Sequence, residues 1–227
     1  MATKTIINTK IYEGMPLSAS PKGDYGFNIR ILDAIRDLMD SALARHPNWL
    51  FMLFTFSYPS NGHKNQKDNI VLPGARIPDD NSVFVYFLNQ YIRALNNSGC
   101  DTGYLWVREQ TAENTRCHYH LAILFNRDVI QYFRSMRQID GYWSQALAKF
   151  GIVAHGANTA GLIDRGRYEQ DGETQLYGMS LHRGNRDEYM AVFQRASYLA
   201  KDYSKDAPRP LNTRTWGRSE GCQGDMR

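Results

Sequence analysis

Apolar residues between positions 27 and 46 recur with the spacing of one helix face. Neighbouring members lie one, three or four residues apart, as in the buried stripe of an amphipathic helix. These positions are Ile31, Leu32, Ile35, Leu38, Met39, Ala42 and Leu43. The sequence His46-Pro47-Asn48 ends the predicted helix, because proline restricts the residue before it. A nearly continuous apolar run at residues 50–57 then indicates a buried strand.

The rest of the chain alternates between strand-like and helical patterns. Residues 103–110 and 117–125 are strand-like runs joined by a short polar turn, and they predict a hairpin. Further elements are a β-like stretch at 5–12, a helix at 80–97 capped by Asp79 or Asp80, a helix at 126–150, a strand at 175–181 and a helix at 187–205 capped by Asn185 or Asp187. We therefore expect an α+β fold with a central, mostly antiparallel sheet flanked by helices.

One main domain is expected, at residues 25–205. Residues 1–24 are interpreted as an N-terminal extension, and residues 206–227 as a polar C-terminal segment that is partly mobile. The length of 227 residues and the hydrophobic content of 42% allow a sizeable core and exclude global disorder.

Net charge and cysteine content limit which partners and which cellular compartment the protein is expected to have. The formal net charge of +4 permits nucleic-acid binding without requiring it. Three cysteines without a Cys-x-x-Cys pair argue against a disulfide framework and favour a reducing, cytoplasmic compartment. The apolar runs are too short to cross a bilayer and the N-terminus lacks the apolar core of a secretory signal, so we expect no membrane partner.

The second strand of the predicted hairpin contains the sequence His118-Tyr119-His120. Side chains alternate along a strand, so the two imidazoles share one face and Tyr119 belongs to the other, which has the character of core. Two imidazoles in this arrangement can bind one divalent metal ion. The alternative is a pair of half-exposed histidines without a ligand.

The first strand of the hairpin supplies a carboxylate. If the two strands pair as expected, Glu109 lies opposite His118 on the same face. Glu113, in the turn, is the competing carboxylate, and an ordinary solvent-facing role for Glu109 is the alternative. Two imidazoles and one carboxylate leave coordination positions open for a phosphate oxygen or water. Such a site suits Mg²⁺ or Mn²⁺, with Zn²⁺ as a further option.

The last predicted helix carries an aromatic residue on its polar side. If the helix runs through this segment, Tyr198 lies opposite the apolar stripe, with Lys201 one turn further on. A nearby ammonium stabilises a phenolate, or the charge on a phosphodiester under attack, as a tyrosine nucleophile requires. An ordinary surface tyrosine is the alternative. Tyr203 falls within the apolar stripe and is interpreted as a core residue.

Together these motifs resemble the HUH endonuclease superfamily of rolling-circle replication initiators and relaxases. The strand at 50–57 is similar to its first motif, His118-Tyr119-His120 to its second, and Tyr198 with Lys201 to its Tyr-x-x-Lys motif. Residues 104–110, 118–126 and 196–201 more closely resemble inovirus gene-two-type replication proteins, which include the YagK/YfjJ-type C-terminal domains of prophages and mobile islands. The resemblance spans roughly residues 25–218 and implies the HUH, RRM-like fold.

The resemblance implies a replication initiation or strand-nicking protein of a phage or mobile element. A divalent metal held by His118, His120 and Glu109 would polarise the scissile phosphate of single-stranded DNA at a replication origin or element end. Tyr198 would attack it and form a 5′-phosphotyrosine link, and Lys201 would steady the developing charge. Reversal would rejoin the strands. A host helicase is an expected partner, because the chain has no Gly-Lys-Ser/Thr phosphate loop.

Three other functions compete with this hypothesis. They are a non-catalytic origin-binding regulator, a single-tyrosine transposase or relaxase, and a metal-dependent phosphoesterase unrelated to DNA nicking. Several basic and aromatic residues are unranked candidates for holding phosphates or stacking bases. They are Arg108, Arg134, Arg137, Trp143, Arg165, Arg167, Arg195 and Trp216.

Overall fold

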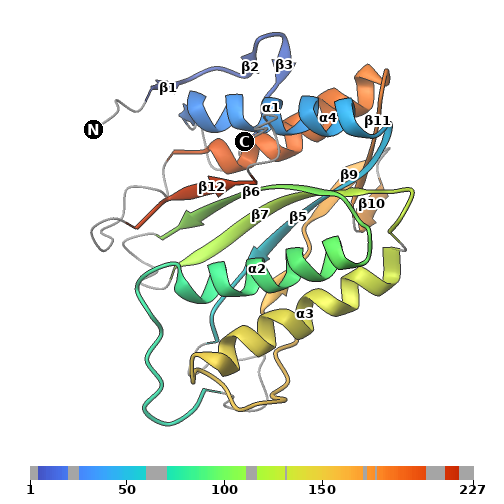
Figure 1. Cartoon of the computed structure of the whole chain (residues 1–227). Coiled ribbons are helices and arrows are strands. Elements are labelled where there is room, and N and C mark those ends of the chain that lie inside the picture. Colours follow the sequence, from blue (N-terminus) through green and yellow to red (C-terminus); the bar gives the residue numbers. More distant parts are fainter. Residues whose placement is uncertain are drawn as a thin grey trace, which may run out of the picture.

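A central sheet organises the described part of the chain, as the sequence predicts, and the structure shows that it has six strands (Figure 1). The computed structural model describes residues 5–19, 26–59, 71–110, 117–130, 132–170, 173–176, 178–202 and 213–219. The strands follow the order β11-β5-β7-β6-β12, β8 also pairs with β5, and all these pairs are antiparallel. The sheet strands are β5 (Asn48–Phe56), β6 (Thr102–Glu109), β7 (His118–Asn126), β8 (Ile163–Asp164), β11 (Met179–His182) and β12 (Trp216–Arg218).

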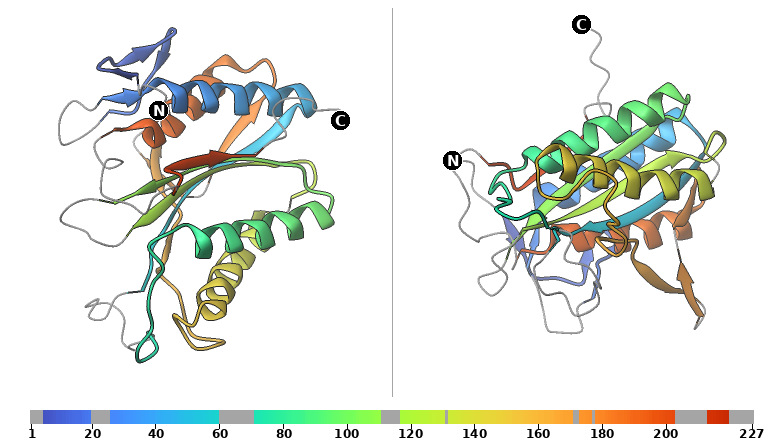
Figure 2. Two further views of the ribbon diagram at one scale, coloured as in Figure 1. Left: turned by 60° about the vertical axis from the view of Figure 1, so that its left-hand side comes forward. Right: turned by 90° about the horizontal axis from the view of Figure 1, so that it is seen from below.

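Helices cover both faces of this sheet (Figures 1 and 2). One face carries α1 (Ile29–Arg45), α4 (Arg186–Ala196) and the 3₁₀ turn η1 (Ser197–Ala200), and the other carries α2 (Ser82–Asn97) and α3 (Tyr132–Lys149). Tyr119 packs in the core on the α2 and α3 side, which confirms the predicted core face of β7. The opposite face is also a core, because β5 and β7 contribute Leu53 and Ala122 to it.

Local sequence explains where α1 begins and ends and where α4 begins. Asn28 caps α1, because its side chain accepts a hydrogen bond from the Arg30 amide at 3.0 Å. The helix stops at Arg45, two residues before Pro47. Asn185 caps α4 in the same way through the Glu188 amide at 3.2 Å.

None of the described helices combines the length with the apolar character that crossing a bilayer requires.

Short strands outside residues 25–205 pair with the main body of the fold. They are β1 (Ile6–Ile7), which pairs with β4 (Phe27–Asn28), and β12, which pairs with β6. The strands β2 (Ile11–Tyr12) and β3 (Met15–Pro16) form a hairpin of their own, and β3 lies against α4. A second small hairpin consists of β9 (Arg167–Gln170) and β10 (Glu173–Leu176). The domain boundaries drawn before residue 25 and after residue 205 stay predictions.

Candidate active site

The hairpin of β6 and β7 brings two histidines and one glutamate together. Its register places Glu109 opposite His118 and Val107 opposite His120, so the predicted pairing of Glu109 with His118 is confirmed. Since directly opposed residues share a face of the sheet, all three polar side chains point to the side covered by α1 and α4. Cys117 lies in the core on the other side, as the alternation of the strand predicts.

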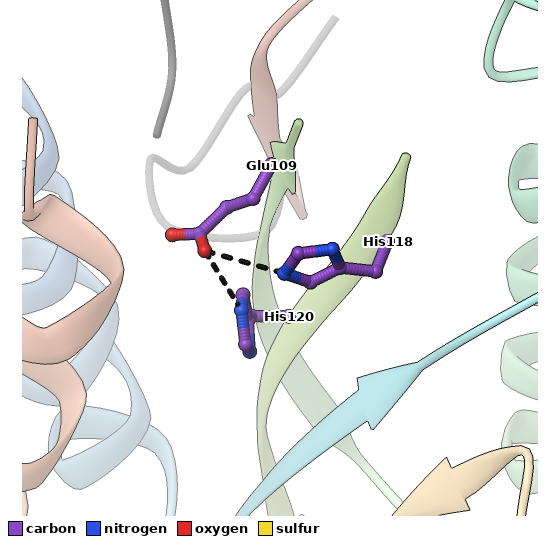
Figure 3. A group of neighbouring side chains, drawn as sticks. All are labelled: Glu109, His118 and His120. Atoms are coloured by element: carbon purple, nitrogen blue, oxygen red, sulfur yellow. Dashed lines mark hydrogen bonds and ion pairs between the residues drawn. The ribbon is translucent and has the colours of Figure 1, made fainter. Parts of the chain in front are cut away.

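The three side chains converge on one point (Figure 3). One carboxylate oxygen of Glu109, Oε2, lies 3.1 Å from Nε2 of His120 and 3.5 Å from Nε2 of His118. One ligand atom from each residue falls within 4.8 Å of the others. Glu109 is 2% exposed and His120 5%, whereas the side chain of His118 is 24% exposed, so the cluster opens to solvent beside His118.

The short distances in this cluster require a hydrogen atom or a cation between its ligand atoms. A carboxylate oxygen and an imidazole lone pair repel each other, so either protons on the two imidazoles or a cation must lie between these atoms. Two nitrogen donors and one oxygen donor form a ligand set for a divalent transition metal ion such as Mn²⁺, with further positions left open. The residues present therefore fit a divalent metal ion, as the sequence predicts. Glu113, the competing carboxylate, lies outside the described residues.

Thr55 supports the cluster from the neighbouring strand β5. It lies directly opposite His120, and its hydroxyl oxygen is 2.9 Å from Nδ1 of that histidine. If Nδ1 carries the proton and donates it to Thr55, the lone pair of Nε2 is directed toward Glu109 and is available to a metal. Sequence reasoning assigned Thr55 only to a buried strand. The Thr55 hydroxyl lies beside His120 because β5 is the neighbour of β7 in the sheet.

Tyr198 lies over the histidine pair. Its ring centroid is 5.2 Å from that of His120, and the two rings are nearly perpendicular, at 72°. The α-helix expected to continue past residue 198 ends at Ala196, and Tyr198 belongs to the 3₁₀ turn η1. This change of backbone path makes Tyr198 partly buried against the core beneath α1, so its predicted position on an exposed helix face is wrong.

Two contacts with the N-terminal part of the chain hold the η1 turn. The Ser197 hydroxyl accepts a hydrogen bond from the Ser18 amide at 2.8 Å and donates one to the Gln194 carbonyl at 2.7 Å. Just after the turn, the backbone of Lys201 pairs with that of Phe27 in a single antiparallel β-bridge. These contacts fix the backbone on both sides of Tyr198.

Lys201 packs directly on the candidate nucleophile. Its ammonium nitrogen lies 4.1 Å from the centroid of the Tyr198 ring, in a cation–π arrangement, and the residue is only 3% exposed. The predicted neighbourhood of Tyr198 and Lys201 is therefore present, although Lys201 is buried where an exposed position was expected. Tyr203 lies outside the described residues.

The described basic and aromatic candidates differ in their surroundings. Trp143 is fully buried in the core, and its indole nitrogen donates to the Ser57 carbonyl at 3.2 Å. Arg108 is 5% exposed and donates to the Asp79 carbonyl at 2.8 Å, and Arg165 forms an ion pair with Asp140. Trp216 forms part of β12 and packs partly buried against the core beneath α1. The side chains of Arg134, Arg137 and Arg167 lie outside what the structure describes.

Comparisons with known proteins place the chain in a family. Among curated proteins there is no matching relative. Among solved structures, the chain is similar to the N-terminal nuclease domain of non-structural protein 1 from minute virus of mice. That viral domain coordinates Zn²⁺ in its active-site pocket and recognises DNA at the origin of replication. That match has 14% identity and a TM-score of 0.37, and it covers 70% of this chain and 81% of the viral one. The family model of the YagK/YfjJ C-terminal domain matches residues 19–219, and the chain therefore belongs to that family.

Proposed function

We propose that this protein is an HUH-type, metal-dependent endonuclease that nicks single-stranded DNA and forms a covalent 5′-phosphotyrosine intermediate. One observation carries the proposal: the Tyr198 ring packs on His120, which is itself part of the Glu109, His118 and His120 cluster. A candidate nucleophile thus lies beside a candidate metal centre, although Tyr198 follows His120 by 78 positions in the sequence. A phosphate ligand of the metal would lie within reach of the phenol oxygen.

In this proposal, His118, His120 and Glu109 hold Mg²⁺ or Mn²⁺, and when bound the metal supplies Lewis-acid polarisation of the scissile phosphate. The phenol oxygen of Tyr198 forms a bond to phosphorus, and the bond from phosphorus to the 3′ oxygen breaks. The phenol proton passes to solvent, and the departing 3′ oxygen takes one up to become a hydroxyl. The buried ammonium of Lys201, held against the ring, steadies the negative charge that develops on the phenol and phosphate oxygens.

Attack by a 3′ hydroxyl on the phosphotyrosine bond reverses the reaction, so the same site rejoins or transfers strands without a nucleotide cofactor. These properties suit replication initiation by a rolling-circle route in a phage or mobile element, with the origin or element end as substrate. A host helicase would separate the strands. The cytoplasmic location stays a prediction from the cysteine content.

The experiment that tests the proposal is a search for the covalent intermediate. We expect purified protein, incubated with Mn²⁺ and a 3′-labelled pool of random-sequence single-stranded oligonucleotides, to give a labelled protein–DNA band that survives denaturing electrophoresis. The same pool labelled at its 5′ end should give no labelled band. The label should remain with the protein when it lies on the 3′ side of the nick, because the link is to the 5′ phosphate. A chelator should prevent the band. An origin-binding regulator would bind DNA and give no band, and that outcome would overturn the proposal.

The Thr55 hydroxyl offers a test of the metal centre that does not depend on activity. We expect Thr55→Val, which keeps the side-chain shape, to weaken Mn²⁺ binding by about tenfold or more, because Nδ1 of His120 loses its 2.9 Å partner. Titration calorimetry measures the affinity, and nitrogen-15 chemical shifts of the imidazole report the tautomer of His120. Thr102→Val, the same change on β6 away from the cluster, is the matched control. Equal Mn²⁺ affinity in the two variants would contradict the role of Thr55.

A further inference from the structure

Arg195 differs from the other arginines that the sequence singles out and whose side chains the structure describes. It occupies the next-to-last position of α4, three residues before Tyr198. Arg108 and Arg165 make hydrogen bonds or ion pairs with protein groups. Arg195 makes no hydrogen bond or ion pair through its side chain with another residue that the structure describes, although it is partly buried. A guanidinium carries five N–H donors, and the free-energy cost of burying it falls when a ligand pairs with it.

A glycine makes room for this guanidinium. A Cβ atom at Gly166 would lie 2.8 Å from Nη2 of Arg195 and 3.2 Å from the carbonyl oxygen of Leu53 on β5. The Arg195 side chain therefore rests against the turn that follows β8, next to β5. Asp164 of β8 is the nearby carboxylate, but its Oδ1 accepts a hydrogen bond from the Gly166 amide at 2.9 Å and forms no ion pair with Arg195.

The same turn lies in line with the histidine cluster. Asp164 is opposite Thr55, and Thr55 is opposite His120, so these residues form one row across β8, β5 and β7. Tyr198 covers the His120 end of the row and Arg195 borders the β8 end. Burial lowers the pKa of Arg195, whereas the charges of Tyr198 and Asp164 raise it, which is consistent with a guanidinium near both. A strand of DNA that crosses the row would pass Tyr198 and the guanidinium in turn.

We propose that Arg195 binds a backbone phosphate of the DNA strand beside the one that Tyr198 attacks. The inference rests on the proposed nicking function and adds a second anchoring point to it. A guanidinium pairs with a phosphate through two parallel hydrogen bonds, which fixes both the position and the rotation of the strand. Because Gly166 has no side chain, the Arg195 guanidinium can lie beside the row of Asp164, Thr55 and His120.

Binding to DNA is measured in the Tyr198→Phe background, so that no covalent adduct forms, with the fluorescent random-sequence single-stranded pool as the probe. We expect the added change Arg195→Gln to weaken binding by about tenfold, because a hydrogen-bonded charge pair is lost. The slope of log K against log salt concentration should fall by about 0.7, the value of one phosphate contact on a single strand. Arg195→Lys should keep the salt slope while recovering part of the affinity.

Arg186→Gln is the matched control, because it removes the same charge from the exposed first residue of the same helix. Unchanged Mn²⁺ binding and an unchanged melting temperature would show that Arg195→Gln leaves the metal centre and the fold intact. If Arg195→Gln and Arg186→Gln have equal DNA affinity and equal salt slopes, the phosphate site is overturned. Formation of the wild-type adduct would then still support the nicking function. If wild type forms no adduct but Arg195→Gln alone loses affinity, the phosphate site stands and the nicking function falls.

Discussion

Tyr198→Phe is expected to abolish the covalent protein–DNA adduct while DNA binding and Mn²⁺ binding persist. The substitution removes one oxygen atom and leaves the ring, which packs on His120 and under the ammonium of Lys201. Without the phenol oxygen there is no nucleophile, so we expect adduct formation to fall by at least about a thousandfold. Denaturing electrophoresis of the labelled complex measures the adduct, and polarisation of a fluorescent strand measures binding.

Two companion variants make this test specific. Tyr86→Phe removes a tyrosine hydroxyl from α2, on the opposite face of the sheet, and should leave the adduct unchanged. Tyr203→Phe examines the other tyrosine near the motif. An adduct that survives Tyr198→Phe and disappears in Tyr203→Phe would show that the nucleophile is Tyr203.

Glu109→Gln is expected to weaken Mn²⁺ binding by at least about a hundredfold, because it replaces a charged ligand by a neutral amide. The side chain is 2% exposed, so an isosteric change is needed to keep the packing around it. The adduct should disappear in parallel with metal binding. Calorimetric titration of Mn²⁺ and its electron paramagnetic resonance signal both report the affinity without requiring turnover.

A second glutamate–histidine pair in the chain provides the control. Oε2 of Glu188 lies 2.7 Å from Nδ1 of His182, and among the described residues no third metal-ligating side chain converges on this pair. Glu188→Gln should therefore leave Mn²⁺ binding as in wild type. Loss of binding in Glu113→Ala, with binding retained in Glu109→Gln, would show that the third ligand comes from the turn of the hairpin.

The cluster of Glu109, His118 and His120 was predictable because it depends on short-range geometry. Alternation along β7 puts His118 and His120 on one face, and a short hairpin leaves few registers, so Glu109 could be placed opposite His118 by counting. The three long strands β5, β6 and β7 and the order of the helices followed from the apolar patterns for the same reason, whereas β8 and β12 were not predicted. Each of these inferences requires knowledge of one strand, one helix or one pair of adjacent strands.

The position of Tyr198 required information that local sequence does not hold. The apolar residues Val192, Phe193, Ala196, Leu199 and Ala200 are all buried, and their spacing fits an α-helix as well as a helix that tightens into a 3₁₀ turn. The turn is selected by contacts with Ser18 and Phe27, far away in the sequence. Arg195 is similar, because its space comes from Gly166 after β8.

The candidate metal centre and the candidate nucleophile are held in place by different parts of the chain. The three candidate ligands come from a single hairpin, within residues 102–126, whereas the backbone around Tyr198 is held by Ser18 and Phe27 at the opposite end of the chain. Evolution or protein engineering can therefore move or replace Tyr198 by altering the η1 turn and its N-terminal contacts, without rebuilding the cluster of Glu109, His118 and His120. Under the proposed function, the part of the site that holds the phosphate and the part that attacks it can therefore change independently.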